Sequence, residues 1–335
     1  MSYSTTIPFA PELLGPLKAV AGPPGQPPIL KEGIQDRRDL TEPFSAPENV
    51  FKDPHLVHED TTIPGPDGNT IEVTIVKKKD QAPGLRPGIF YLHGGGLILG
   101  KRTFLLQSTF PWIKELDTVL ITPEYRLAPE NQHPAMVEDC YAALKWVVEN
   151  TSKLGIDPNK LMIAGHSAGG GLAAGTTLLA RDRKLPVKLC AQLLCYPMLD
   201  DRRITVSSRQ FDDVGTWKGN LNDLAWSCVL DGKKDREDVI YAAPARATDL
   251  SGLPTTWIDV GAAEPFRDED VAYATKLWEC GVQTELHVWA GAFHGYDLFA
   301  PESEVAAAGH AARMSWLKRV LDYSPPVTVT VTAAL

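Results

Sequence analysis

A serine between glycines, in Gly165-His166-Ser167-Ala168-Gly169, separates a run of apolar residues from an Ala/Gly-rich segment. Gly-x-Ser-x-Gly is typical of a chain that turns from a strand into a helix within about one residue, because a Cβ at either glycine would collide with nearby backbone. Such a strained turn pushes the serine hydroxyl into the open. The pattern alone occurs by chance in many proteins. In this strand–turn–helix context it favours a catalytic nucleophile, Ser167.

A second glycine-rich motif, His93-Gly94-Gly95-Gly96, directly follows the apolar run 89–92. Three consecutive glycines leave backbone N–H groups free to converge on one substrate oxygen. Acyl transfer needs such donors because charge accumulates on that oxygen in the tetrahedral intermediate, and each donor is worth about 10²–10³ in rate. Alone, the motif is also compatible with a flexible turn. Upstream of a nucleophile turn, it predicts an oxyanion hole made by the amides of Gly94, Gly95 and Ala168.

The segment 169–174, Gly-Gly-Gly-Leu-Ala-Ala, also fits the Gly-x-Gly-x-x-Ala fingerprint of dinucleotide-binding folds. A nicotinamide-dependent oxidoreductase is therefore an alternative function. That fingerprint should be followed by a second strand that ends in an acidic residue about 20 positions on. Here a helical pattern runs on to Arg181-Asp182-Arg183 instead. We therefore interpret the glycines as a close helix–sheet contact and expect no cofactor.

Together the two motifs resemble the α/β-hydrolase fold, and within it the hormone-sensitive-lipase-like (family IV) carboxylesterases. Further stretches match that family: Tyr125-Arg126-Leu127-Ala128-Pro129-Glu130, Pro134-Ala135 with Glu138-Asp139, and Leu253-Pro254-Thr255-Thr256. The similarity covers about residues 55–322. It implies a mostly parallel central sheet flanked by helices with a mainly helical cap, an enzyme that hydrolyses carboxylic esters, and Arg126 and Asp139 as structural supports around the oxyanion loop.

His294 is the best candidate for the base that such a serine requires. A serine hydroxyl is a poor nucleophile until a base takes its proton, and a third group must orient that base. In this fold the order along the chain is serine, acid, histidine. His294 lies in Gly291-Ala292-Phe293-His294-Gly295, just past the apolar run 286–289. The other histidines precede the nucleophile, belong to the two glycine motifs, or lie within a predicted strand or helix.

Glu264 is the acid that the resemblance implies. The family has an aspartate in Gly-x-x-Asp-x-Leu-x-Asp-Glu, whereas residues 261–269 read Gly-Ala-Ala-Glu-Pro-Phe-Arg-Asp-Glu. Glutamate is chemically competent, but its extra methylene requires the loop or the imidazole to shift slightly. The alternative is that Glu264 is a surface residue and that Asp259 or Asp268 orients the base.

These residues must be positioned by strands that alternate with helices. The segment 70–76 alternates polar and apolar residues with the period of a strand. Short apolar runs predict further, buried strands at 89–92, 118–121, 161–164, 189–195, 256–260 and 286–289. Helical patterns separate most of them, at 137–149, 168–181, 268–280 and 302–321. Such alternation predicts a mostly parallel sheet covered on both faces.

Three segments lie outside this alternation. Seven prolines within the first 28 residues predict an extended or turn-rich arm without regular helix, either a loose tail or an arm laid over the body. Residues 200–242 are interpreted as a mainly helical insertion, whose Trp217 and Trp226 line an apolar substrate pocket or pack within the insertion itself. In the tail 326–332, Val and Thr alternate after Pro326, and this strand must pair with a sheet edge or a second subunit, which leaves a homodimer open.

The predicted domain boundaries follow from these segments. They are an N-terminal arm and cap part at 1–50, a hydrolase core at 51–199 and 243–322, a cap insertion at 200–242, and a C-terminal tail strand at 323–335.

Composition narrows the function classes and the location. The 335 residues carry 33 Lys+Arg against 42 Asp+Glu, a formal net charge of −9, which argues against nucleic acid or an anionic membrane surface as a partner. No apolar run approaches the ~20 residues of a membrane span, and the N-terminus lacks the features of a signal peptide. Five cysteines without a Cys-x-x-Cys pair suit a reducing compartment, and His55-Leu56-Val57-His58 lacks the spacing of a metal site. We expect a cytoplasmic enzyme without a metal.

The sequence thus predicts a serine carboxylesterase that hydrolyses small to medium esters through an acyl-enzyme, with Ser167, His294 and Glu264 as the triad. A lactone hydrolase on the same triad is the nearest alternative. A non-catalytic small-molecule receptor on the same fold is more remote, since such receptors lose the histidine that is present here at position 294. A peptidase or amidase would share the triad, although the family resemblance favours esters.

Overall fold

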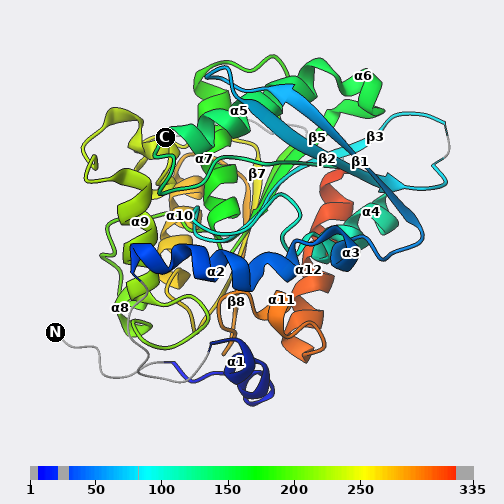
Figure 1. The fold of residues 1–335 in the computed structure, drawn as a ribbon. Helices are drawn as coiled ribbons and strands as arrows, with labels where there is room; N and C mark the ends of the chain where they lie inside the picture. Colours follow the sequence, from blue (N-terminus) through cyan, green and yellow to red (C-terminus); the bar gives the residue numbers. More distant parts are fainter. Residues whose placement is uncertain (1–6, 22–29, 82, 322–335) are drawn as a thin grey trace, which may run out of the picture.

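The computed structural model describes residues 7–21, 30–81 and 83–321, and within them one eight-stranded sheet organises the chain (Figure 1). The strand order is β1-β2-β4-β3-β5-β6-β7-β8. The strands are β1 (Leu56–Pro64), β2 (Thr70–Lys78), β3 (Arg86–Leu92), β4 (Val119–Pro123), β5 (Ile156–His166), β6 (Ala191–Cys195), β7 (Thr255–Gly261) and β8 (Thr284–Trp289). The β1–β2 and β2–β4 pairs are antiparallel and all other pairs are parallel. The predicted mostly parallel sheet is confirmed.

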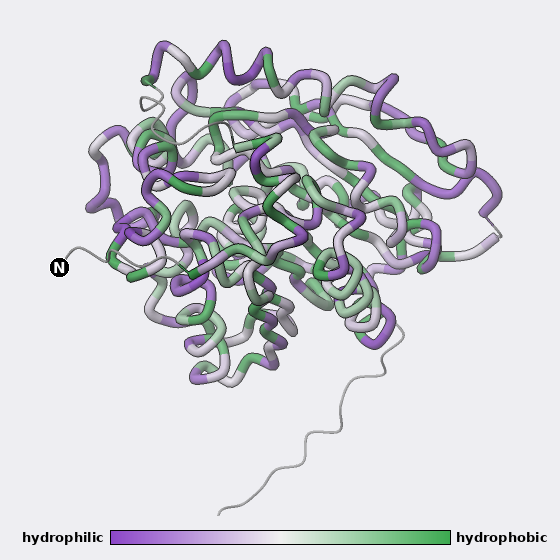
Figure 2. Tube along the Cα trace, turned by 90° about the horizontal axis from the view of Figure 1, so that it is seen from below, coloured by the Kyte–Doolittle hydropathy of each residue, from purple (hydrophilic) through white to green (hydrophobic). Residues whose placement is uncertain are grey.

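Both faces of the sheet are covered, because its central strands are apolar on both sides. Phe90 of β3 and Ile163 of β5 belong to one buried cluster, whereas their neighbours Ile89 and Met162 belong to a second one. This alternation follows from the two-residue period of a strand, which sends successive side chains to opposite faces. Figure 2 shows the more hydrophilic segments along the outer turns and the apolar ones through the middle of the molecule.

Helices form the two outer layers. They are α1 (Leu14–Ala21), α2 (Ile34–Thr41), α3 (Pro47–Val50), α4 (Phe110–Leu116), α5 (Ala135–Glu149), α6 (Thr151–Leu154), α7 (Ala168–Asp182), α8 (Ser207–Gln210), α9 (Gly219–Leu230), α10 (Arg267–Glu279), α11 (Tyr296–Phe299) and α12 (Glu304–Leu321). Buried residues of α5, α7 and α10 belong to the first cluster, and those of α4 and α12 to the second. The four predicted helical patterns correspond to α5, α7, α10 and α12.

The expectation that the proline-rich arm contains no regular helix is wrong for the part that the structure describes. A 3₁₀ turn at Pro11–Leu13 leads into α1. Pro11 begins the 3₁₀ turn and Pro16 lies in the first turn of α1, where a backbone N–H has no helical acceptor to lose. Four of the seven prolines lie at 23–28, outside the described residues.

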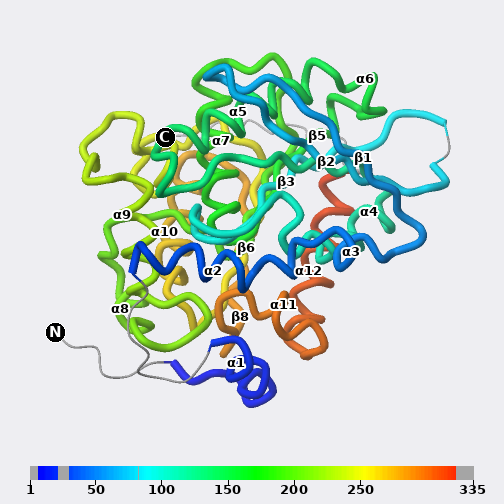
Figure 3. Tube along the Cα trace, in the orientation of Figure 1, coloured from blue at the N-terminus to red at the C-terminus, as the bar shows by residue number. Residues whose placement is uncertain are grey.

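The described arm lies on the body of the protein. The side chains of Leu13 and Leu17 are buried in the second cluster. The Ala10 N–H donates to the Gly291 carbonyl at 3.0 Å, and the Glu12 carboxylate accepts bonds from two N–H groups at the start of α12. Figure 3 shows α1 beside α11, next to the loop that follows β8. The arm therefore contacts the loop that carries His294.

Two further predicted segments are the insertion at 200–242 and the C-terminal tail. Residues 200–242 contain α8, α9 and a 3₁₀ turn at Glu237–Tyr241 between β6 and β7. Their assignment to a cap, and the domain boundaries around them, stay predictions. The predicted tail strand at 323–335 lies outside the described residues.

All five cysteines are free thiols. In the described part of the chain, no group of three His, Cys, Asp or Glu side chains is arranged to hold a metal ion. Across the same residues, none of the helices combines the length and apolar content that a membrane crossing requires.

Candidate active site

Ser167 lies at the carboxyl end of β5, in the sharp turn into α7. Its backbone has φ 56° and ψ −124°, a strained conformation for a residue with a side chain. Its N–H donates to the Cys195 carbonyl at 2.9 Å. A Cβ on Gly165 would lie 2.2 Å from the Gly169 carbonyl oxygen, and one on Gly169 would lie 2.1 Å from the Leu92 carbonyl oxygen. Both glycines are thus required for the turn, as the motif predicts.

His294 bridges the serine and an acid. Its Nε2 lies 2.8 Å from Ser167 Oγ, and its Nδ1 lies 2.5 Å from Glu264 Oε2. Ser167, Glu264 and His294 follow β5, β7 and β8, and these parallel strands end at the same edge of the sheet. The topology therefore brings together three residues that are 97 and 30 positions apart in the sequence.

Glu264 is fully buried, and its second carboxylate oxygen accepts the Gly261 N–H at 3.3 Å. Burial raises the pKa of Glu264, and the adjacent His294 counteracts part of that rise. The two alternative acids have other partners. Asp259 binds the Arg313 guanidinium, and Asp268 accepts bonds from Ser207 N–H and Arg267 Nε. Of the three acids considered from the sequence, Glu264 is the one bonded to His294.

The His-Gly-Gly-Gly turn runs beside the serine. A Cβ on Gly94 would lie 3.3 Å from the Ser167 Cβ, and Gly95 has φ +114°, a region that side chains rarely adopt. The Gly95 carbonyl accepts the Leu99 N–H at 2.8 Å, which closes the turn. The Ala168 N–H lies in the first turn of α7, where a helix supplies no carbonyl acceptor.

The side chains of His93 and Tyr125 support this turn. Their rings stack at 4.3 Å, and Tyr125 Oη donates to the His93 carbonyl at 2.7 Å. The His93 Nδ1 lies 2.7 Å from the Gly94 carbonyl oxygen. Because burial lowers the pKa of His93 to about 4, this ring is neutral at pH 7 and Nδ1–H is the donor. The carbonyls of His93 and Gly94 are thereby held in place.

Two arginines support the segment around the turn. Arg126 forms a bidentate pair with the buried Asp139, at 2.7 and 2.8 Å. Arg38 of α2 donates to the carbonyls of Ile98 and Ala128 at 2.8 and 2.9 Å. Arg38 was not identified from the sequence. It lies in a polar N-terminal segment, and its acceptors are backbone carbonyls, which leave no sequence signal.

The insertion 200–242 reaches the site through Thr216 and Trp217. The Thr216 hydroxyl donates to the His294 carbonyl. A Cβ on Gly96 would lie 2.1 Å from the Trp217 indole, so this indole lies directly on the glycine turn; its ring is 6.4 Å from that of His294. Trp226, the other predicted pocket residue, is buried in the first cluster, as Trp217 is.

Two further rings enclose His294. Phe266 lies edge-on at 5.0 Å with a 90° interplanar angle, and Tyr196 lies at 5.0 Å with an angle of 73°. Neither was identified from the sequence. Tyr196 directly follows β6, and its place after a buried strand is the signal that could have indicated it.

His166, which precedes the serine, is buried among aromatic rings and lies 3.0 Å from Tyr91 Oη. Burial lowers the pKa of His166 to about 4, as it does for His93. The ordinary value is about 6.5, so the unfolded chain binds these protons first as the pH falls. The contribution that these two neutral histidines make to the free energy of unfolding is therefore fully present above pH 6.5 and is lost progressively between about pH 6.5 and 4.

We predict that His166→Asn weakens this pH dependence. Between pH 7.5 and 5, the free energy of unfolding of the wild type should fall by about 2 kcal/mol more than that of His166→Asn. Urea denaturation at both pH values measures this difference. The exposed His55 gives a matched control, since His55→Asn should follow the wild type. Equal pH slopes for wild type and His166→Asn would contradict a buried neutral His166.

The parallel sheet, the serine turn at the carboxyl end of β5 and the loops after β7 and β8 define an α/β hydrolase. A family model described as the alpha/beta hydrolase fold matches residues 89–298, and the chain belongs to this family. Within it, the chain belongs to the hormone-sensitive-lipase-like carboxylesterases, which confirms the predicted enzyme class, a carboxylic ester hydrolase.

Similar proteins support this placement. The chain is 36% identical over 242 residues to carboxylesterase NlhH of Mycobacterium tuberculosis, which covers 70% of this chain and 74% of that protein. It is 29% identical over 304 residues to arylacetamide deacetylase of Bos taurus, covering 72% of this chain and 75% of that protein. The solved structure of a bacterial heroin esterase has a TM-score of 0.85, with 35% identity, over 93% of this chain and 98% of that one.

Proposed function

We propose that Ser167, His294 and Glu264 form the catalytic triad of this esterase. His294 Nε2 takes the proton of the Ser167 hydroxyl as the serine oxygen attacks the ester carbonyl. Glu264 holds the imidazole in the tautomer with Nδ1–H and stabilises the imidazolium that forms. His294 then gives the proton to the departing alkoxide, which leaves an acyl-enzyme. Water, deprotonated by the same histidine, attacks the acyl group; the bond to Ser167 Oγ then breaks, His294 returns the proton to Oγ, and the acid is released.

The amides of Gly94, Gly95 and Ala168 are proposed as the oxyanion hole. The turn that holds Gly94 and Gly95 lies beside the Ser167 side chain, and the Ala168 N–H starts α7. A helix N-terminus favours negative charge, so this N–H acts with the dipole of α7 on the developing oxyanion. The bonds of His93 and Tyr125 keep the turn in place before the substrate arrives, which reduces the reorganisation that the reaction requires.

The observation that carries this proposal is the unbroken line of hydrogen bonds from Glu264 Oε2 through His294 to Ser167 Oγ, at 2.5 and 2.8 Å. Hydrogen-bond contact between nucleophile and base, with the base bonded to a buried third group, is the arrangement that activates a serine.

Residues 1–50 and 200–242 are proposed as a cap over a core formed by 51–199 and 243–322. Arg38 reaches the oxyanion segment from the first part, and Thr216 and Trp217 reach His294 and Gly96 from the second. The second part thus contacts the proposed base, and the first part contacts the segment that follows the glycine turn. The Trp217 indole on the glycine turn limits the space beside the oxyanion hole, which suits small to medium esters.

We predict that Trp217→Leu shifts the preferred acyl chain to greater length. The smaller side chain vacates space beside Gly96, so kcat/KM for a p-nitrophenyl octanoate relative to the acetate should rise about tenfold. Trp226→Leu is the matched control: both tryptophans are buried in the first cluster, but Trp217 is the one whose ring lies against Gly96 and 6.4 Å from the His294 ring, so Trp226→Leu should leave this ratio unchanged. The pocket assignment fails if the two variants shift the ratio equally.

A chain-length series of p-nitrophenyl esters tests the proposed activity, with small lactones as a second substrate class. Measurable turnover of short and medium esters is expected. Labelling by a p-nitrophenyl phosphate triester, followed by peptide mass spectrometry, should place one adduct on Ser167. A lactone hydrolase is the alternative on the same triad, and a kcat/KM that is higher for lactones than for every ester would favour it. No turnover of either class would contradict the proposal.

A further inference from the structure

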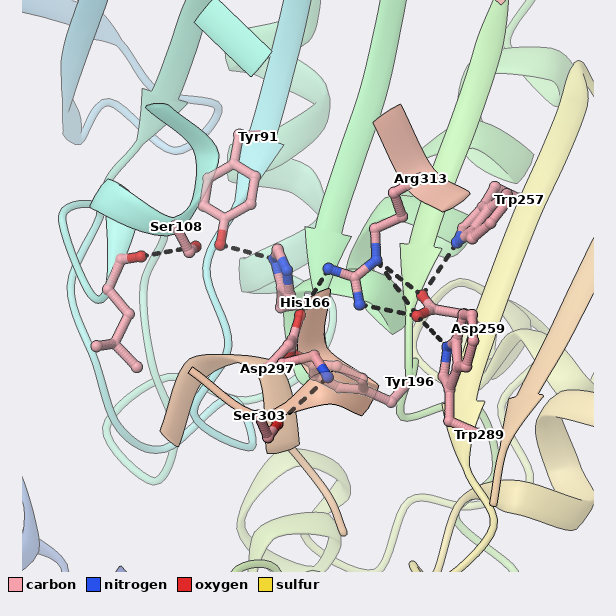
Figure 4. Close-up of polar contacts among 12 residues, drawn as sticks. Tyr91, Ser108, His166, Tyr196, Trp257, Asp259, Trp289, Asp297, Ser303 and Arg313 are labelled. Atoms are coloured by element: carbon pink, nitrogen blue, oxygen red, sulfur yellow. Dashed lines mark hydrogen bonds and ion pairs between the residues drawn. The ribbon is translucent and has the colours of Figure 1, made fainter. Parts of the chain in front are cut away.

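A buried cluster of charged and polar side chains surrounds Arg313 and Asp259 (Figure 4). Arg313 of α12 is only 1% exposed, yet it pairs with two buried carboxylates, those of Asp259 at 2.8 Å and Asp297 at 2.6 Å. Asp259 also accepts the indole N–H groups of Trp257 and Trp289, both at 3.0 Å. The cluster therefore joins β7, β8, α11 and α12 through bonds with well-defined geometry.

Tyr196 connects this cluster to His294. Its Oη donates to Asp297 Oδ1 at 2.8 Å, and its backbone N–H donates to the Asp259 carbonyl at 2.5 Å. Tyr196 has φ 37°, a conformation that side-chain-bearing residues rarely adopt, directly after β6. Its fully buried ring lies 5.0 Å from the His294 ring, at 73°. In Figure 4 the Tyr196 side chain extends toward Asp297, and the guanidinium of Arg313 lies between His166 and the carboxylate of Asp259.

The cluster lies close in sequence to two members of the triad and has a ring contact beside the third. Asp297 is three residues after His294, and Asp259 is five residues before Glu264. For the third member, Ser167, the ring of the preceding residue, His166, lies 5.6 Å from the Tyr196 ring. Tyr196 is thus the one side chain of this cluster that contacts the His294 ring itself, while its polar end is bonded to the cluster.

The ionisation states keep these bonds in place. Burial alone would raise the pKa of Asp297, but the charge of Arg313 and its hydrogen bond to this carboxylate outweigh burial and hold that pKa well below its usual range. Burial raises the pKa of Tyr196 far above its usual value, so Oη stays protonated and remains the donor. Buried ion pairs cost desolvation and are often no more stabilising than apolar packing, whereas they do fix geometry.

We propose that Tyr196 is a positioning residue for His294, held in place by the Asp297–Arg313–Asp259 cluster. The inference rests on the proposed role of His294 as the base. A neutral or charged imidazole can rotate about its χ2 angle, and a misplacement of about 1 Å costs roughly 10²-fold in rate. The ring of Tyr196 closes one side of the space in which that rotation occurs, and its bond to Asp297 stops the ring itself from moving.

Tyr196→Phe tests this inference, because it keeps the ring and removes only the bond to Asp297. We expect kcat for a p-nitrophenyl ester to fall about 10- to 100-fold with KM changed less than twofold. The downfield proton resonance of His294 Nδ1–H, identified by its loss in His294→Ala, should shift or broaden. Tyr273→Phe is the matched control, since Tyr273 is buried and its Oη has no partner among the described residues; it should retain wild-type kcat.

Asp297→Asn gives a second variant from the other end of the bond, and a similar loss of kcat is expected. A wild-type kcat in Tyr196→Phe would overturn the inference. So would a loss of kcat in a variant with a lowered Tm and an unchanged His294 proton resonance, because the role would then be structural only. Failure of the triad is a different result, seen as full activity in Ser167→Ala whatever Tyr196→Phe does.

Discussion

Ser167→Ala is expected to reduce kcat for short p-nitrophenyl esters by about 10⁴- to 10⁶-fold, the largest effect of any single change in the chain. Without Oγ no acyl-enzyme forms, and the ester must react with water directly. The oxyanion donors and the binding surface remain, so a small residual rate above that in water should persist. Initial rates at saturating substrate measure the loss.

The substitution should leave the fold intact, because Ser167 is a small side chain in a turn whose shape depends on Gly165 and Gly169. An unchanged Tm would show this. Ser108→Ala is a matched control, as Ser108 is a half-buried serine whose hydroxyl donates to the Leu105 carbonyl, away from the proposed triad; it should retain wild-type kcat. The phosphate triester should label Ser108→Ala and not Ser167→Ala. Full activity in Ser167→Ala would remove this serine from the mechanism.

The fold was predictable because its signals are local. The strands β2 to β8 appear as short apolar or alternating runs, and α5, α7, α10 and α12 each have their own pattern, so the order of these elements follows from the sequence; β1 (Leu56–Pro64) was not predicted. The N-terminal helix α1 was missed, because proline density indicates no helix unless the prolines lie in a first turn. Its packing against the loop after β8 depends on a contact over about 280 residues, for which a single sequence carries no signal.

The candidate site was predictable to a different extent. Ser167 and Gly94 are found from short motifs in which glycine is required sterically. His294 follows from its place after a strand, and Glu264 from the family resemblance alone. Tyr196 and Arg38 were missed, because their roles depend on partners from distant elements, Asp297 and the carbonyls of Ile98 and Ala128. The supports Arg126 and Asp139 were found because they lie in family motifs, whereas Arg38 and Tyr196 lie in none and are found from contacts.

Glu264→Gln is expected to lower kcat by about 10⁴-fold, the second large effect. The amide preserves the size of the side chain but carries no charge. It either donates to His294 Nδ1, which puts the proton on Nε2 and prevents that atom from accepting the serine proton, or accepts from Nδ1–H without stabilising the imidazolium. KM should change little, because Glu264 is fully buried and lies on the far side of His294 from Ser167.

Two companion variants make this result specific. Asp268→Asn changes the family-motif acid that was the alternative orienting group; its carboxylate bonds to Ser207 and Arg267, so kcat should stay near the wild type. Glu264→Asp keeps the charge but shortens the side chain by one methylene, so its carboxylate lies farther from His294 Nδ1 than the 2.5 Å of Glu264 Oε2. It should retain more activity than Glu264→Gln and less than the wild type. If Asp268→Asn loses more kcat than Glu264→Gln, the orienting acid is Asp268, and Glu264 has only a packing role.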